Sequence, residues 1–119
     1  MYTILVVDDK PSQVEMMCAM LSKLNIECMT AYSGFDSVEI AREMQPDLII
    51  MDWVMPVATM TGNDATRQIL SDSLTNHIPI VACSAVHNLS DALIVGCVDY
   101  LTKPFSINQL LNMIQPYLN

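Results

Sequence analysis

Short apolar runs alternate with segments of helical periodicity along the whole chain, and this alternation restricts the fold more than any other feature. The runs typical of buried strands span residues 3–8, 26–31, 47–51, 78–85 and 98–101. Apolar residues recur at helical spacing in the segments that follow them, at 11–25, 34–44, 62–74, 89–95 and 107–114. Strands that alternate with helices in this way predict a parallel sheet covered by helices on both faces.

These elements place the chain in the α/β class. Right-handed crossovers between parallel strands leave few topologies. We expect a flavodoxin-like (βα)5 fold, a doubly wound parallel sheet with strand order 2-1-3-4-5. The chain has 119 residues, of which 52% are apolar, so a well-buried core can form and residues 1–119 are expected to make one domain.

Charge and hydropathy exclude several functional classes. No apolar run approaches the roughly 18 residues that span a bilayer, and the start, MYTILVVDD, lacks the basic residues of a signal peptide. We therefore expect a soluble, cytoplasmic protein that does not enter a membrane. Five basic residues against 13 acidic ones give a net charge of −8, which opposes direct binding to nucleic acid or to anionic membranes.

The four cysteines show no metal-binding spacing. Each lies in an apolar segment, and no pair has the CxxC arrangement; they are Cys18, Cys28, Cys83 and Cys97. Two disulfides are conceivable, but a cytoplasmic domain with its own core does not need them. We expect buried free thiols and no zinc.

Polar side chains occur where the predicted strands end. The first predicted strand ends in Asp8, with Asp9 next, and Asp52 follows the third. Ser84 lies near the end of the fourth strand, and Lys103 follows the fifth. Open α/β sheets carry their sites at the carboxyl ends of strands, next to the point where strand order reverses. A single aspartate after a strand is usually a turn former, but the ordered set predicts a functional site on this edge.

The same residues lie in motifs that resemble the receiver domains of bacterial two-component response regulators, over essentially the whole chain. The motifs are VVDD (6–9), PDLIIMDWVMP (46–56), CSA (83–85) and DYLTKPF (99–105). The resemblance, which points to single-domain regulators of the chemotaxis type, implies that residues 1–119 are a receiver domain. It also implies a cis peptide between Lys103 and Pro104.

The resemblance implies that Asp52 is the phosphoacceptor and that Ser84 and Lys103 bind the phosphoryl oxygens. It further implies a divalent metal, Mg²⁺ with Mn²⁺ as a substitute, held by Asp8, Asp9, Asp52 and the backbone carbonyl of Val54. Physical chemistry agrees, because like charges raise one another's pKa and a hard dication with oxygen ligands reverses that effect. Such a protein is no conventional enzyme: it catalyses only its own phosphoryl transfer and dephosphorylation.

Signal output is implied to depend on Ser84 and Tyr100. Ser84 moves toward the phosphoryl group, Tyr100 turns inward, and the surface of the segments 89–95, 98–101 and 107–114 changes shape. The implied partners are a sensor histidine kinase or phosphotransfer protein and a downstream protein that binds this surface. A phosphorylation-dependent dimer is a further possible assembly, to which no surface is assigned.

Three features depart from the family pattern. The loop MPVATMTG (55–62) is about two residues longer than usual, beside the phosphorylation site. The stretch from Ser84 to Lys103 is about three residues shorter, so the fourth helix is expected to have only about two turns. Lys10 directly follows the acidic pair, where a solvated side chain is expected.

Two other functional classes are open on the sequence. One is a receiver-like module that binds partners without phosphorylation, against which the intact polar set argues. The other is a hydrolase with an aspartyl nucleophile, which normally has a DxD motif and a cap domain where this chain has DDK. The kinase, the downstream protein, the oligomeric state and the phosphate lifetime are not predicted by the sequence.

Overall fold

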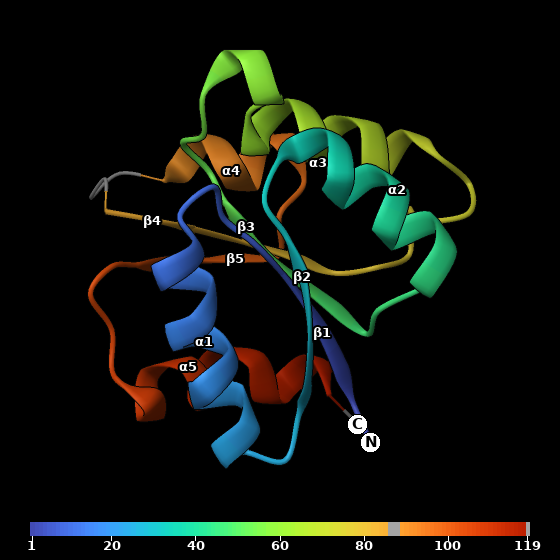
Figure 1. Cartoon of the computed structure of the whole chain (residues 1–119). Helices are drawn as coiled ribbons and strands as arrows, with labels where there is room; N and C mark the ends of the chain where they lie inside the picture. The colour runs from blue at the N-terminus through green and yellow to red at the C-terminus, as the bar shows by residue number, and fades with distance from the viewer. Residues whose placement is uncertain (86–88, 119) are drawn as a thin grey trace.

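Five parallel strands form one sheet in the order β2-β1-β3-β4-β5, which confirms the predicted topology (Figure 1). The strands are β1 (Thr3–Val7), β2 (Glu27–Ala31), β3 (Leu48–Asp52), β4 (Ile80–Ser84) and β5 (Asp99–Thr102). This computed structural model describes residues 1–85 and 89–118. His87, for which the sequence favours a surface position, lies outside the described residues.

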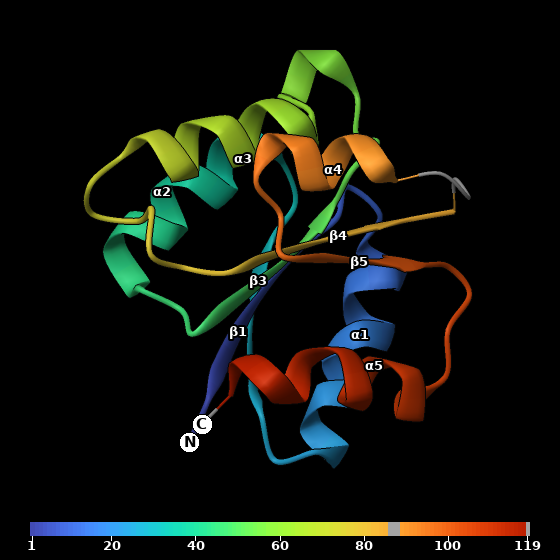
Figure 2. The ribbon, with the colours of Figure 1, turned by 180° about the vertical axis from the view of Figure 1, so that it is seen from behind.

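Helices cover both faces of the sheet, as Figures 1 and 2 show from opposite sides. One face carries α2 (Gly34–Met44), α3 (Gly62–Ser71) and α4 (Ser90–Val95), and the other carries α1 (Pro11–Lys23) and α5 (Ile107–Ile114). Two short 3-10 turns, Val57–Thr59 (η1) and Gln115–Tyr117 (η2), complete the fold. Among the described residues, no helix is long and apolar enough to cross a membrane.

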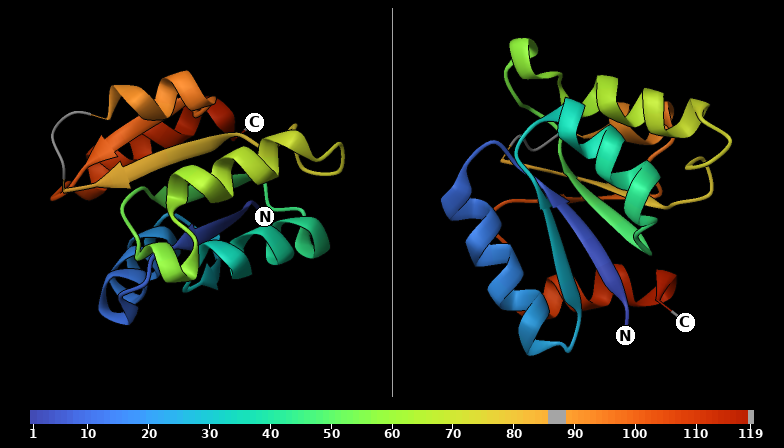
Figure 3. Two further views of the ribbon diagram at one scale, coloured as in Figure 1. Left: turned by 90° about the horizontal axis from the view of Figure 1, so that it is seen from above. Right: turned by 45° about the vertical axis from the view of Figure 1, so that its right-hand side comes forward.

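The sheet separates two hydrophobic cores, and Figure 3 shows the layered arrangement from above. The core under α2, α3 and α4 is built around Leu5, Ile49, Met51, Ile69, Ile80 and Leu89. The core under α1 and α5 is built around Ile4, Val14, Leu21, Ile50, Val81 and Leu110. Successive residues of a strand point to opposite faces, so each central strand contributes to both cores and reads as an unbroken apolar run.

Local signals set most helix boundaries close to their predicted positions. Ser33 accepts a hydrogen bond from the backbone N–H of Asp36 and begins α2, and Gln45 ends it in a left-handed conformation. Ser106 and Gln109 form a reciprocal capping box at the start of α5. The fourth helix, α4, has only six residues, in line with the expected shortening.

The third helix ends earlier than the sequence predicts. It stops at Ser71, although apolar spacing continued to Leu74. The hydroxyl of Thr75 donates to the backbone carbonyl of Ile69, and the N–H of Leu74 donates to the side chain of Asp72. These side-chain hydrogen bonds take the place of the backbone hydrogen bonds that would continue α3, so the helix ends about one turn early.

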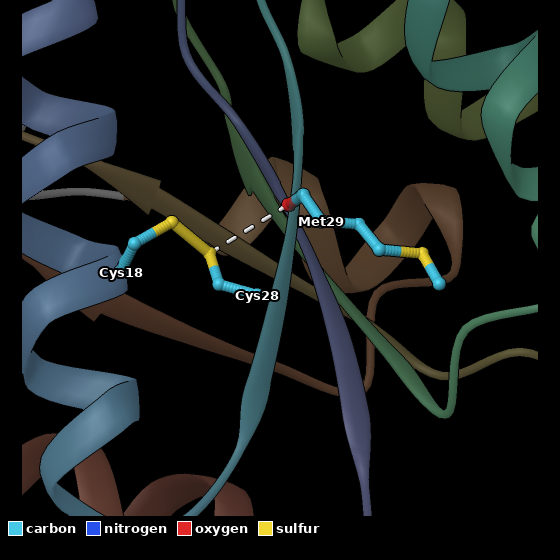
Figure 4. The surroundings of a disulfide bond; sticks show 3 residues. All are labelled: Cys18, Cys28 and Met29. Carbon is cyan, nitrogen blue, oxygen red and sulfur yellow. Dashed lines mark hydrogen bonds between the residues drawn. A yellow bond between two sulfur atoms is a disulfide. The ribbon is translucent and has the colours of Figure 1, made fainter.

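The prediction of free thiols is wrong for one pair of cysteines. Cys18 on α1 and Cys28 on β2 form a disulfide, with their Cα atoms 5.4 Å apart (Figure 4). The sulfur of Cys28 also lies 3.7 Å from the backbone carbonyl oxygen of Met29. Helical and strand spacing describe each element separately, so they do not reveal which side chains meet between α1 and β2. Cys83 and Cys97 are buried free thiols, as predicted.

Candidate functional site

The residues predicted to form a site do come together at the carboxyl edge of the sheet. Asp8 follows β1, Asp52 is the last residue of β3, and Ser84 is the last residue of β4. All three are more than nine-tenths buried. Lys103 follows β5, and its backbone N–H donates to the carbonyl of Ser84. The crevice between the ends of β1 and β3 is where strand order reverses, which is the expected place for a site in this fold.

Asp8 is held by two hydrogen bonds from different parts of the chain. The ammonium of Lys103 lies 2.7 Å from Oδ2 of Asp8. The backbone N–H of Lys10 donates to Oδ1 of Asp8 over 3.0 Å. Both carboxylate oxygens are therefore engaged, and the orientation of Asp8 toward the crevice is fixed. The peptide between Lys103 and Pro104 is cis, as the resemblance implies.

Three carboxylates converge in the crevice. One oxygen from each of Asp8, Asp9 and Asp52 lies within 4.8 Å of the other two. Oδ1 of Asp9 is buried and, among the described residues, has no hydrogen-bond partner. A buried, unpaired carboxylate oxygen beside two further carboxylates is costly unless a cation completes the site. The donor set consists of hard oxygen ligands and fits Mg²⁺, which binds proteins through few carboxylates and keeps several waters.

The electrostatics of the cluster act most strongly on Asp52. The pKa of Asp52 is raised from 3.8 to about 7, chiefly by burial and further by the negative charge of Asp8. The charge of Lys103 and the N–H of Val54, which lies 3.4 Å from Oδ1 of Asp52, act in the opposite direction. Without a metal, Asp52 is thus partly protonated near neutral pH, which weakens it as a nucleophile.

The cation on the other side of the crevice stays charged. Burial lowers the pKa of Lys103, but the hydrogen bond to Asp8 and the charge of Asp52 outweigh burial, and the net pKa is raised. The neighbouring thiol of Cys83 behaves differently, because burial raises its pKa to about 12. Lys103 therefore supplies a permanent positive charge, whereas Cys83 forms a neutral wall.

The start of α3 packs directly on the backbone of the phosphoacceptor candidate. A Cβ atom at Gly62 would collide with the carbonyl oxygen of Asp52, so only glycine allows this approach. Thr61 accepts a hydrogen bond from the N–H of Asp64 and begins the helix there. The long loop before Gly62 contains η1, and its apolar Val57 is exposed. The loop prediction missed this turn because no short motif marks it.

A cavity of about 570 Å³ opens above Asp52, Ser84 and Lys103. The cavity is also lined by Gln13 and Met16 of α1 and by Phe105 after β5, to which the sequence assigned no role in the site. Helical spacing gives the buried stripe of α1 but does not show that its flank faces the crevice. Val54, whose backbone carbonyl is the fourth predicted ligand, lines the same cavity.

The predicted switch residue lies away from the crevice. Tyr100, in the edge strand β5, is 37% exposed. The apolar side chains of Leu93 and Ile94 of α4 and of Val98 are also exposed. In the described parts of α4, β5 and α5 there are two carboxylates, Asp91 and Asp99, and no basic residue. This surface is apolar and acidic.

Comparisons with known proteins agree with this geometry. Residues 4–115 match the response regulator receiver domain. The protein PilH of Pseudomonas aeruginosa is 37% identical over 121 residues, which cover 99% of this chain and 98% of PilH. The polar-differentiation response regulator DivK of Brucella ovis is 28% identical and covers 98% of this chain and 95% of its own length.

Solved structures share the architecture closely. The chemotaxis protein CheY4 of Vibrio cholerae superimposes with a TM-score of 0.90 at 30% identity, covering 99% of both chains. The receiver domain of the sensor histidine kinase PA1611 from Pseudomonas aeruginosa gives a TM-score of 0.88 at 32% identity, covering 98% of this chain and 96% of that one. That structure carries a magnesium ion coordinated in its active site cleft.

Proposed function

Because this chain belongs to the response regulator receiver domain family, we propose that it is a phosphoacceptor domain in which Asp52 takes up the phosphoryl group. Members of this family are signalling modules of two-component systems, which receive phosphoryl groups from histidine kinases or phosphotransfer proteins. The observation that carries the proposal is the convergence of Asp8, Asp9 and Asp52, with an unpaired buried oxygen on Asp9.

We propose that Asp8, Asp9, Asp52 and the backbone carbonyl of Val54 hold Mg²⁺, with Mn²⁺ as a substitute. When bound, the metal neutralises the carboxylates and offsets the charge of the incoming phosphoryl oxygens. An oxygen of Asp52 then attacks phosphorus while the bond from phosphorus to the donor breaks. Lys103 and Ser84 are assigned to the phosphoryl oxygens, since both line the cavity above Asp52.

The geometry explains why little further machinery is needed. The carboxylate of Asp52 sits at the end of a rigid central strand, and its backbone is clamped by the start of α3 at Gly62. Phosphoryl transfer depends mainly on positioning and on charge stabilisation. The same residues can orient water for slow loss of the phosphate, so the proposed chemistry is limited to the domain's own phosphorylation and dephosphorylation.

We propose that the surface of α4, β5 and α5 carries the output. Ser84 of β4 is paired in the sheet with Thr102 of β5. A shift of Ser84 toward the phosphoryl group can therefore be transmitted through β5 to Tyr100, which lies two positions before Thr102. A downstream protein that binds there meets exposed apolar side chains and two carboxylates. A phosphorylation-dependent dimer stays a prediction, which the elution volume of the protein with and without phosphate will test.

The proposed function is tested with a small phosphodonor. Incubation with acetyl phosphate and Mg²⁺ is expected to add one phosphoryl group by intact mass, labile to hydroxylamine as an acyl phosphate is. The variant Asp52→Asn and omission of Mg²⁺ should each abolish incorporation, while Asp64→Asn, on the exposed start of α3, should not. No incorporation in the wild type would favour a phosphorylation-independent interaction module instead. Cytoplasmic location belongs to the same proposal, because histidine kinases act there.

A further inference from the structure

The disulfide between Cys18 and Cys28 links α1 to β2, the strand that follows it along the chain. Cys18 lies in the second half of α1, and Cys28 is the second residue of β2. Strand β2 lies at the edge of the sheet, next to β1, and only its last residue is fully buried. Figure 4 shows the bond crossing from the helix to this edge strand. The bridge is therefore placed at the margin of the fold.

The two bonded cysteines differ from the other two in accessibility. Cys18 and Cys28 are half-buried at the flank of the core, whereas Cys83 and Cys97 are buried. Burial also raises the pKa of Cys83 to about 12 and that of Cys97 to about 11, so these thiols stay protonated and unreactive. Thiol chemistry is therefore confined to the pair at the margin.

The fold does not depend on the bridge for its core. The core under α1 is filled by fully buried residues of the same helix, Val14, Met17 and Leu21, and Cys18 and Cys28 only pack against its edge. The bonded residues are separated by ten positions in sequence, so the bond closes a short loop. With the core intact, the protein is expected to stay folded when the bond is reduced.

We propose that Cys18 and Cys28 are a reversible redox site that exchanges with low-molecular-weight disulfides of the glutathione type and fixes α1 on β2 when oxidised. One thiolate of the pair attacks a sulfur of the external disulfide and releases one thiol, which leaves a mixed disulfide on the protein. The second thiolate then attacks the protein-bound sulfur and releases the second thiol. The pair loses two electrons and two protons, and the external disulfide gains them as two thiols.

Under the proposed cytoplasmic location, on which this inference rests, a reversible bond is favoured over a permanent one. Disulfides in proteins of reducing compartments are usually transient and redox-sensing, and partial exposure gives an external thiolate access to the sulfur atoms. The consequence is mechanical. Because α1 begins at Pro11, directly after the segment with Asp8 and Asp9, the bond restrains the helix that follows the acidic pair.

The test equilibrates the full chain in buffers of reduced and oxidised glutathione and then traps free thiols with an alkylating agent, read by intact mass. The native protein should pass from two added labels to none as the buffer becomes more oxidising, with Cys83 and Cys97 labelled only after denaturation. Variants Cys18→Ser and Cys28→Ser should lose this two-electron transition and instead accept one glutathione. Cys97→Ser should keep the transition.

Amide hydrogen exchange on the two forms supplies a readout that labelling does not. Reduction should speed exchange at least several-fold in the second half of α1 and in β2, and should leave α5 unchanged. The double variant C18S/C28S should match the reduced wild type. Three outcomes would overturn the proposal: a pair that stays labelled at every glutathione ratio, a bond that is reduced only on unfolding, or exchange rates that are equal in both forms.

Discussion

Lys103 and Asp8 form an ion pair of 2.7 Å that bridges the ends of β5 and β1, two strands separated in the sheet by β3 and β4. The ammonium of Lys103 lies across the crevice against Oδ2 of Asp8, and Asp8 is also a predicted metal ligand. The side chain of Lys103 is 20% exposed and that of Asp8 is 6% exposed. The carboxylate of Asp8 is therefore much less accessible to water than the ammonium of Lys103. In the metal-free protein, Lys103 provides the counter-charge for Asp8.

Replacement of Lys103 should change stability and metal affinity in opposite directions. In Lys103→Met, Asp8 is left buried without its counter-charge, which should lower the free energy of unfolding by about 3 kcal/mol without metal. Mg²⁺ no longer competes with the ammonium for Asp8, so its affinity should rise. Urea unfolding measures the first effect. Mg²⁺ titration followed by the fluorescence of Trp53, the residue that directly follows Asp52, measures the second.

Lys23→Met is the matched control for that experiment, because Lys23 is exposed at the end of α1. It should change neither quantity beyond a few tenths of a kcal/mol. Weaker Mg²⁺ binding in Lys103→Met would contradict the competition and would show that the lysine supports the metal site.

The metal-free protein should lose stability as pH rises. The pKa of Asp52 is about 7 in the folded protein against an ordinary 3.8, so ionisation costs more in the folded state than in the unfolded state. The unfolded chain thus releases this proton first, and the free energy of unfolding should fall as pH rises from 3.8 to about 7. Urea unfolding in the presence of a chelator, across this range, measures the slope.

Two variations separate Asp52 from the other carboxylates in the pH experiment. Asp52→Asn removes the titrating group and should flatten the dependence. Saturating Mg²⁺ favours the ionised carboxylate and should also flatten or reverse it. A wild-type slope that persists in Asp52→Asn would show that another group is responsible.

Gly62 should be intolerant of even the smallest side chain. In Gly62→Ala, the added Cβ collides with the carbonyl oxygen of Asp52, so α3 or the end of β3 must shift. Overpacking of this kind costs typically about 1–3 kcal/mol. Because the shift displaces Asp52, phosphorylation by acetyl phosphate should slow as well. Thermal unfolding and the phosphorylation rate measure the two effects, and Asn63→Ala, one residue along the same helix, should change both much less.

The cysteine bridge should stabilise the protein only when it is oxidised. A closed loop with a sequence separation of ten is expected to contribute about 2–3 kcal/mol, since the bond restricts the unfolded chain. Cys18→Ser should therefore lower the denaturant midpoint in oxidising buffer. In reducing buffer, wild type and variant should unfold at nearly the same denaturant concentration. Equal midpoints in oxidising buffer would show that the bond does not form in solution.

The strands were predictable because their signals are local, whereas the order 2-1-3-4-5 was adopted from the flavodoxin-like fold. The run LIIM before Asp52 is apolar at every position, which is typical of a short strand buried on both faces. Parallel pairing then brings the strand ends to one edge, so the convergence of Asp8, Asp52 and Lys103 follows from topology. Helix caps such as Ser33 and Ser106 likewise act on neighbouring residues.

The features that escaped prediction all depend on contacts between elements. The bridge from Cys18 to Cys28 requires the rotation of α1 about its axis relative to β2, which spacing within either element does not give. Gln13 reaches the cavity for the same reason. The early end of α3 depends on Thr75, whose hydroxyl reaches back to the turn that it caps. Periodicity describes which residues are buried, but not what they meet.

The division of the interior by the sheet has an evolutionary consequence. Side chains above and below the strands belong to two separate hydrophobic cores, so a substitution in the layer of α2, α3 and α4 can be compensated within that layer. The proposed output surface draws on both layers, because α4 packs on one core and α5 packs on the other, which also borders the bridge between Cys18 and Cys28. Adaptation to a new downstream protein therefore involves both cores, while the carboxylates at the strand ends can stay unchanged.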